Sequence, residues 1–208
     1  MRTRPPRATV AVAAVTVAAY LAVSTFGIDN RATMMGGFIP ARLSGLALGG
    51  AVPVWLTPLT ATLLHANLVH LGSNLLMLFF CGREDEVALG PAGVVTLYLV
   101  GAYAAAAGQF VAGPHSGIPM IGASGAISAL VGAYALLYGQ RRQVSAHPEV
   151  SRWLHILWLA AGWLCIQLLL GFASAIQGVA IAAAAHVGGF IAGLLLARPL
   201  LLWRYRKA

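Results

Sequence analysis

The sequence predicts an all-α, polytopic membrane protein built as a bundle of about six membrane-spanning helices. Hydrophobic residues make up 60% of the 208-residue chain and charged residues only 9%, and the mean hydropathy is +0.83. These values lie well outside the range of soluble domains. Because each span needs about 20 residues, the chain accommodates about six helices with short connections. We therefore expect a single transmembrane domain over residues 1–208.

The first predicted span covers residues 8–26, an uncharged apolar run that follows a short segment rich in arginine and proline. Its length of about 19 residues exceeds the apolar region of a signal peptide, which has about 7–15, so the pattern favours a retained span. Residues 27–64 contain several glycines and prolines, and their apolar pieces are too short to cross a bilayer. We expect this segment to form an outer-face loop that lies partly in the membrane interface.

Five further spans are predicted over residues 66–81, 92–111, 124–139, 153–172 and 181–203. The span over 66–81 ends at a charged stretch, residues 82–86, which we interpret as a turn in which Arg83 and Glu86 interact. Gly90 and Pro91 then suit the end of one helix and the start of the next.

The basic residues predict how the chain is oriented. The six spans place most of the Lys and Arg residues on one side of the membrane, against Arg31 and Arg42 on the other. Cytoplasmic loops are the ones that carry excess positive charge, so both termini are expected in the cytoplasm. The net charge of +8 is thus explained by topology, and because it forms no single cationic face it does not indicate nucleic-acid binding.

Three polar groups occur at similar depth in otherwise apolar spans. Ser124 begins the fourth span and precedes Arg141 by a length of helix of about 25 Å. His70 and His186 each lie about 20 Å from charged residues at the cytoplasmic end of their spans. Polar groups at this depth are costly unless they are paired or line a cavity, so a coincident set predicts a functional site in the outer half of the bilayer.

Helical spacing predicts that two of these groups meet. Small residues recur every four positions after Ser124 in the fourth span, and His186, Gly189 and Gly193 share one face of the sixth. Two small-residue faces allow close approach of the helix backbones. We expect the packed pair to bring His186 within side-chain reach of Ser124, which is the arrangement of a nucleophile and its general base.

The few acidic residues limit the chemistry. They are Asp29, Glu84, Asp85, Glu86 and Glu149. None is placed to orient His186, so the sequence predicts a serine–histidine dyad rather than a triad. His70 and Asn74, one turn apart in the second span, and the backbone N–H of Ser124 are candidate donors to an oxyanion. No His-Glu-x-x-His motif is present, and we expect neither a metal nor a cofactor.

Four motifs occur in order along the chain: His65-x4-His70-x3-Asn74, Gly82-Arg83-x2-Glu86-x3-Gly90, Gly122-Ala123-Ser124-Gly125 and Ala185-His186-x2-Gly189-x3-Gly193. In kind and order they resemble the motifs of the rhomboid intramembrane serine proteases, of the compact six-helix bacterial type, over about residues 38–197. The resemblance implies Ser124 as nucleophile, His186 as general base, and His70 with Asn74 as oxyanion donors. It also implies location in the bacterial inner membrane and transmembrane protein substrates that are cut near their extracytoplasmic end.

Two other classes of function are weighed against a protease. A catalytically inactive relative would bind membrane protein clients, but the presence of both Ser124 and His186 counts against it. A small channel or transporter is disfavoured because the spans lack carboxylates, a charged pore stripe and internal repeats. His65 either contributes to the site or only caps its helix. Ser128 stands where some rhomboids stack a tyrosine on the catalytic histidine, so the sequence leaves open what holds the ring of His186.

Overall fold

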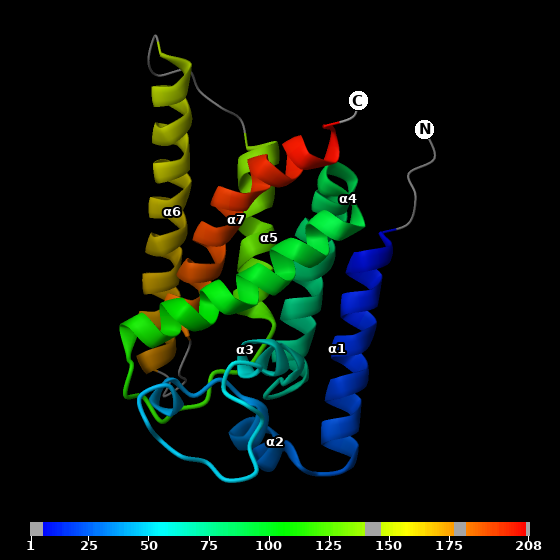
Figure 1. Cartoon of the computed structure of the whole chain (residues 1–208), viewed down its shortest axis with the longest axis vertical. Helices are drawn as coiled ribbons and strands as arrows, with labels where there is room; N and C mark the ends of the chain where they lie inside the picture. Colours follow the sequence, from blue (N-terminus) through cyan, green and yellow to red (C-terminus); the bar gives the residue numbers. More distant parts are fainter. Residues whose placement is uncertain (1–5, 140–146, 177–181, 207–208) are drawn as a thin grey trace.

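The structure is a computed structural model that describes residues 6–139, 147–176 and 182–206, and these residues form a helical bundle (Figure 1). Within them the only β-structure is an isolated bridge between Phe38 and Met120. The all-α prediction is therefore confirmed for the described part of the chain. The long helices are α1 (Arg7–Thr25), α4 (Leu68–Ala112), α5 (Ser124–Tyr138), α6 (Pro148–Ile176) and α7 (Ala183–Arg204), and the short ones are α2 (Asp29–Gly36), η1 (Pro40–Arg42), α3 (Thr57–Thr60) and η2 (Ala61–Leu63).

Three of the described helices are long and apolar enough to cross a membrane, namely α1, α4 and α7. The central helix α5 is apolar but has only 15 residues. The count of six spans stays a prediction, as does the orientation of the chain. Several of the basic residues used to predict that orientation lie outside the described residues, and these are Arg2, Arg4, Arg141, Arg142 and Lys207.

Helix α4 contains the second and third predicted spans, with a break at Gly90. This glycine has φ +77°, a left-handed value that glycine adopts without steric cost, and Pro91 opens the following helical segment. The predicted position of the break is thus confirmed. The predicted turn over residues 82–86 is wrong, because the helix continues through these charged residues.

Glu86 explains why charged residues are accommodated in this helix. Its carboxylate accepts hydrogen bonds from the backbone N–H groups of Ala8 (3.0 Å) and Thr9 (2.9 Å) and from the hydroxyl of Thr9 (2.8 Å). It therefore caps the first turn of α1, where backbone donors have no intrahelical partner and negative charge is favoured. The interpretation of Glu86 as a partner of Arg83 is wrong, since Arg83 pairs with Glu84 at 2.9 Å.

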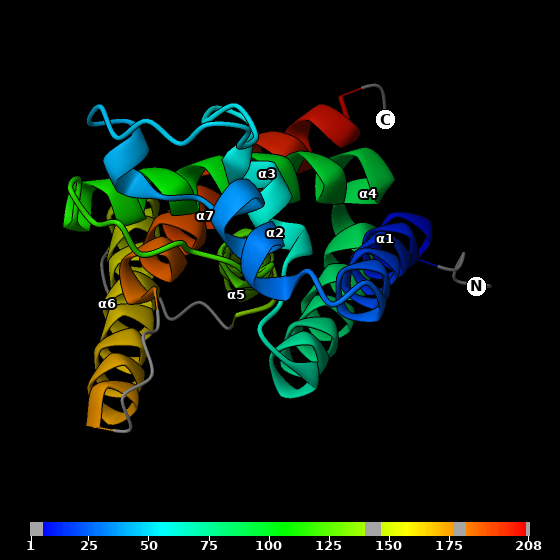
Figure 2. The ribbon, with the colours of Figure 1, turned by 90° about the horizontal axis from the view of Figure 1, so that it is seen from below.

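Helix α5 lies at the centre of the bundle, between α4 and α7 (Figure 2). Glycines allow its close contact with α7. A methyl group added at Gly189 would overlap the carbonyl oxygen of Gly125, and one at Gly193 would overlap that of Ala129. Such contacts fix the register between the two helices, because neither backbone can move along the other without a clash.

Helix α6 lies at the edge of the bundle and packs chiefly against α7 (Figures 1 and 2). At the opposite edge, α1 packs against α4. The segment that joins α1 to α4 contains α2, η1, α3 and η2. It gathers at one end of the bundle, away from the start of α1 and the end of α7 (Figure 1).

Candidate active site

Ser124 and His186 meet at the start of two packed helices. Ser124 is the first residue of α5 and His186 lies in the first turn of α7. The Nε2 atom of His186 is 2.7 Å from the Oγ atom of Ser124, which is hydrogen-bonding distance. Both residues are half-buried. The structure thus brings together the pair that the small-residue faces of the two spans predict.

The position of Ser124 leaves backbone donors beside its hydroxyl. The N–H groups in the first turn of an α-helix have no partner within the helix, and the helix dipole favours negative charge there. Ser128, one turn further on, donates its hydroxyl to the carbonyl of Ser124 (2.8 Å) and so lies against the same turn. A negatively charged oxygen that develops beside Ser124 would meet these donors.

The start of α4 places His70 near the same point. Asn67 caps this helix, since its side-chain oxygen accepts a hydrogen bond from the N–H of His70 (2.8 Å). The ring of His70 then reaches Gly122: a Cβ atom built on Gly122 would lie 2.6 Å from Nε2 of His70 and 3.8 Å from Oγ of Ser124. His70 therefore borders the site, and only a glycine at 122 leaves room for its ring.

Asn74 is buried one turn after His70, with 5% of its surface exposed. Its Nδ2 group donates to the backbone carbonyl of His70 (2.7 Å), while among the described residues nothing bonds to its Oδ1 atom. The amide group is thus held by its own helix. To donate to an oxyanion, the Nδ2 group must either use its second hydrogen or break this bond to the carbonyl of His70. The sequence did not indicate that this bond is present.

His65 contacts the residue that precedes Ser124. Its Nε2 atom accepts a hydrogen bond from the N–H of Ala123 at 3.5 Å, and its ring lies 5.0 Å from that of His70. Burial, with a smaller effect from the neighbouring His70, lowers the pKa of His65 from the usual 6.5 to about 4. A neutral ring is the form that can accept from Ala123. Of the two readings of His65 left open by the sequence, the contact favours a supporting role at the site.

The loop before Ser124 is tied to the segment between α1 and α4. Phe38 and Met120 exchange two backbone hydrogen bonds (3.0 and 2.8 Å), and the N–H of Gly122 donates to the carbonyl of Ala61 (2.9 Å). Gly122 has φ +109°, a backbone conformation that residues other than glycine rarely adopt. These contacts fix the turn that leads into Ser124. In the sequence, only the Gly122-Ala-Ser-Gly motif indicated this turn.

The turn of α7 that carries His186 is held by an aromatic pair. Trp163 of α6 donates its indole N–H to the backbone carbonyl of His186 (3.3 Å), and its ring stacks on Phe190, with centroids 5.0 Å apart. Sequence reasoning did not single out either aromatic residue. The contact links the position of α6 to that of the candidate base.

The chain matches the Rhomboid domain family over residues 53–203. It is similar to "Rhomboid protease GlpG" of Yersinia pestis (strain Pestoides F), with 36% identity over 137 residues, which cover 64% of this chain and 44% of that protein. It is also similar to "Rhomboid protease GlpG" of Pectobacterium atrosepticum, with 30% identity over 192 residues, or 91% of this chain and 61% of that protein. The chain therefore spans about half the length of these curated relatives. From the extent of the domain match, the chain belongs to the rhomboid family.

Proposed function

We propose that this protein is an intramembrane serine endopeptidase that cleaves transmembrane protein substrates through a dyad of Ser124 and His186. The observation that carries the proposal is the 2.7 Å contact between Nε2 of His186 and Oγ of Ser124. Support also comes from the family and from relatives named as proteases. The proposed location is the bacterial inner membrane, with both termini cytoplasmic and one transmembrane domain over residues 1–208.

In the proposed reaction, Oγ of Ser124 attacks the carbonyl carbon of the scissile bond while His186 takes the hydroxyl proton. The tetrahedral intermediate collapses when the C–N bond breaks, and His186 returns the proton to the leaving amine. Water, deprotonated by His186, then hydrolyses the acyl-enzyme ester and regenerates the hydroxyl of Ser124. Neither a metal nor a cofactor enters these steps.

Negative charge on the carbonyl oxygen is the main electrostatic demand of this reaction. The proposed donors are the backbone N–H of Ser124, the ring of His70 and the amide of Asn74. His70 is supported by its closeness to Gly122. Asn74 is supported by its position one turn away, provided that its bond to the carbonyl of His70 is shared or released when substrate binds.

A serine-directed fluorophosphonate probe tests the proposal on the detergent-solubilised protein. We expect the wild type to be labelled and Ser124→Ala to lose labelling. Labelling of His186→Ala should be much slower than that of the wild type, because the hydroxyl of Ser124 is unreactive until a base takes its proton. Ser73→Ala, which removes an exposed hydroxyl from α4, is the matched control and should keep wild-type labelling. Labelling of Ser124→Ala at the wild-type rate, or no labelling of the wild type, would overturn the assignment. The second outcome would favour an inactive relative that binds membrane clients.

A further inference from the structure

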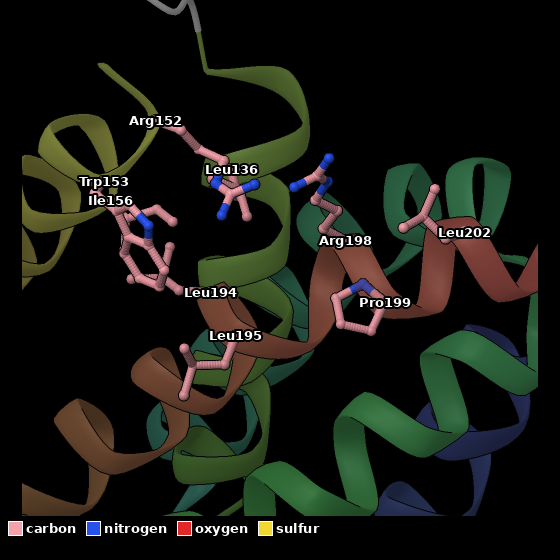
Figure 3. A pocket seen from close by; sticks show the side chains of 9 residues that line it. All are labelled: Leu136, Arg152, Trp153, Ile156, Leu194, Leu195, Arg198, Pro199 and Leu202. Carbon is pink, nitrogen blue, oxygen red and sulfur yellow. The ribbon is translucent and has the colours of Figure 1, made fainter. Parts of the chain in front are cut away.

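A cavity separate from the candidate active site lies where the start of α6 faces the end of α7. Its volume is about 280 Å³, and most of its lining is apolar, with side chains from α5, α6 and α7 (Figure 3). His186 lies in the first turn of α7, whereas this cavity borders residues of its last three turns, such as Arg198 and Leu202. It therefore belongs to the other end of the bundle.

Two arginines line this cavity, and its lining contains no acidic residue. Arg152 comes from α6 and Arg198 from α7, and Figure 3 shows both side chains beside the cavity. Arg152 pairs with Glu149 (2.8 Å), whose side chain is 67% exposed. Among the described residues no carboxylate pairs with Arg198. The three side chains together carry a formal charge of +1, so the site attracts an anion.

The rest of the lining suits a hydrocarbon chain. Trp153, Leu195 and Leu202 line the cavity, yet 50%, 55% and 61% of their surfaces are exposed. Apolar side chains that remain exposed on a membrane protein face lipid, and tryptophan is enriched at the level of the headgroups. A groove with two cations beside an apolar wall matches a molecule with an anionic head and an apolar tail.

We propose that this cavity binds an anionic phospholipid, with its phosphate between Arg152 and Arg198 and one acyl chain along Leu195 and Leu202. Guanidinium groups bind phosphate oxygens through paired hydrogen bonds, and basic pockets between membrane helices on the cytoplasmic side accept anionic headgroups. The lipid would bridge α6 to α7, which is the helix that α6 chiefly contacts. The proposal does not depend on catalysis by Ser124.

Native mass spectrometry of the full chain in detergent can test the site. Phosphatidylglycerol and phosphatidylcholine with identical acyl chains are added at equal concentration, and the ratio of the two retained lipids is measured. We expect the wild type to retain phosphatidylglycerol preferentially. The double variant Arg152→Gln/Arg198→Gln should lower this ratio about tenfold, since each arginine contributes attraction to the anionic headgroup. Arg198→Gln alone should also lower this ratio, because the side chain is exposed and has no carboxylate partner among the described residues.

The matched control is Arg83→Gln/Arg206→Gln, which removes the same charge from exposed positions outside the cavity. It should keep the wild-type ratio, and an equal fall in both double variants would overturn the site in favour of general charge attraction. Equal retention of the two lipids by the wild type would also overturn it, as would displacement of phosphatidylglycerol by free glycerol phosphate at the same concentration.

Glu149→Gln separates an anionic lipid from a zwitterionic one with an ammonium group. Removal of the carboxylate next to Arg152 raises the local positive charge, so we expect the preference for phosphatidylglycerol to increase. If the wild type instead prefers phosphatidylethanolamine to phosphatidylglycerol, and Glu149→Gln loses its preference for phosphatidylethanolamine, the proposal is wrong. Because every readout is lipid retention, the result is independent of whether the protein cleaves substrates.

Discussion

At the scale of single residues, Gly122 determines how closely the ring of His70 approaches Ser124, the candidate nucleophile. Its φ of +109° lies in the region that favours glycine, and its Cα faces the ring of His70. A Cβ atom at this position would lie 2.6 Å from Nε2 of His70. Any larger residue must therefore strain the turn and displace either the ring or the start of α5.

We expect Gly122→Ala to slow fluorophosphonate labelling of Ser124 by about a hundredfold, the loss typical of a misplacement of about 1 Å among reacting groups. Gly117→Ala is the matched control in the same loop, because nothing lies within 4 Å of a Cβ built on Gly117 and its φ is not in the left-handed region. The control should label at the wild-type rate. Similar rates for the two variants would contradict the role given to Gly122.

The burial of His65 predicts that the stability of the folded protein depends on pH. Its pKa is lowered from 6.5 to about 4 in the folded protein, chiefly by burial and then by His70. The unfolded chain therefore takes up a proton as the pH falls through about 6.5, whereas the folded chain resists protonation until about pH 4. The stability that comes from a neutral His65 is complete above this window and is lost as the pH falls through it.

Unfolding midpoints measured in detergent between pH 7 and pH 4.5 should fall, and His65→Gln should fall less steeply than the wild type. His115→Gln removes an exposed histidine from a loop and should keep the wild-type slope. A wild-type slope in His65→Gln would mean that another group causes the pH dependence. The comparison uses slopes, so a constant loss of stability from the substitution does not affect it.

The sequence predicted the partners Ser124 and His186 because both lie on small-residue faces whose spacing is visible in one dimension. It did not predict the bond from Asn74 to the carbonyl of His70, or that from Ala123 to His65. These depend on a side-chain rotamer and on a loop whose path is set by contacts with residues such as Ala61, far away in the chain. Local periodicity contains no information about either.

At the scale of elements, α1 and α4 depend on each other through Glu86. The carboxylate satisfies three donors at the start of α1 and allows α4 to continue helically past Cys81. The sequence favoured a turn there because charged residues are costly in hydrocarbon. That cost is offset by a partner 77 residues away in the chain, which cannot be identified without the packing of the two helices.

We expect Glu86→Gln to lower the free energy of unfolding by about 1–2 kcal/mol, because the substitution removes the charge and one acceptor oxygen from a helix cap. Glu84→Gln, which removes only the exposed pair with Arg83, should change it by less than about 0.5 kcal/mol. Unfolding of both variants in mixed detergent micelles measures the difference. Equal effects would show that the bonds from Glu86 to α1 contribute little to stability.

At the scale of the whole molecule, the candidate active site lies at one end of the bundle, and the start of α1 and the end of α7 lie at the other (Figure 1). The dyad is at the start of α5 and α7, and the loop before Ser124 is bonded to η2. The same end contains α2 and α3, which precede α4. If the termini are cytoplasmic, as the basic residues predict, the site opens toward the extracytoplasmic face.

This arrangement predicts where a substrate is cut. A peptide bond can reach Ser124 only in an extended conformation, because a helical segment keeps its carbonyl groups in its own hydrogen bonds. Unwinding is least costly near the end of a substrate span, at residues with weak helix propensity. We therefore expect cleavage of a model single-span substrate near its extracytoplasmic end.

Mass spectrometry of the products identifies the cleaved bond, and the substrate can be inserted in both orientations as an internal control. Cleavage should follow the extracytoplasmic end in each orientation, since the position of Ser124 at one end of the bundle sets the depth of the cut. When a pair of helix-weakening residues is moved along the substrate span, the cleaved bond should move with it only within the segment of the substrate that can reach Ser124. Products that cluster at the cytoplasmic end would mean that the chain is oriented opposite to the prediction from its basic residues, with the dyad geometry unchanged.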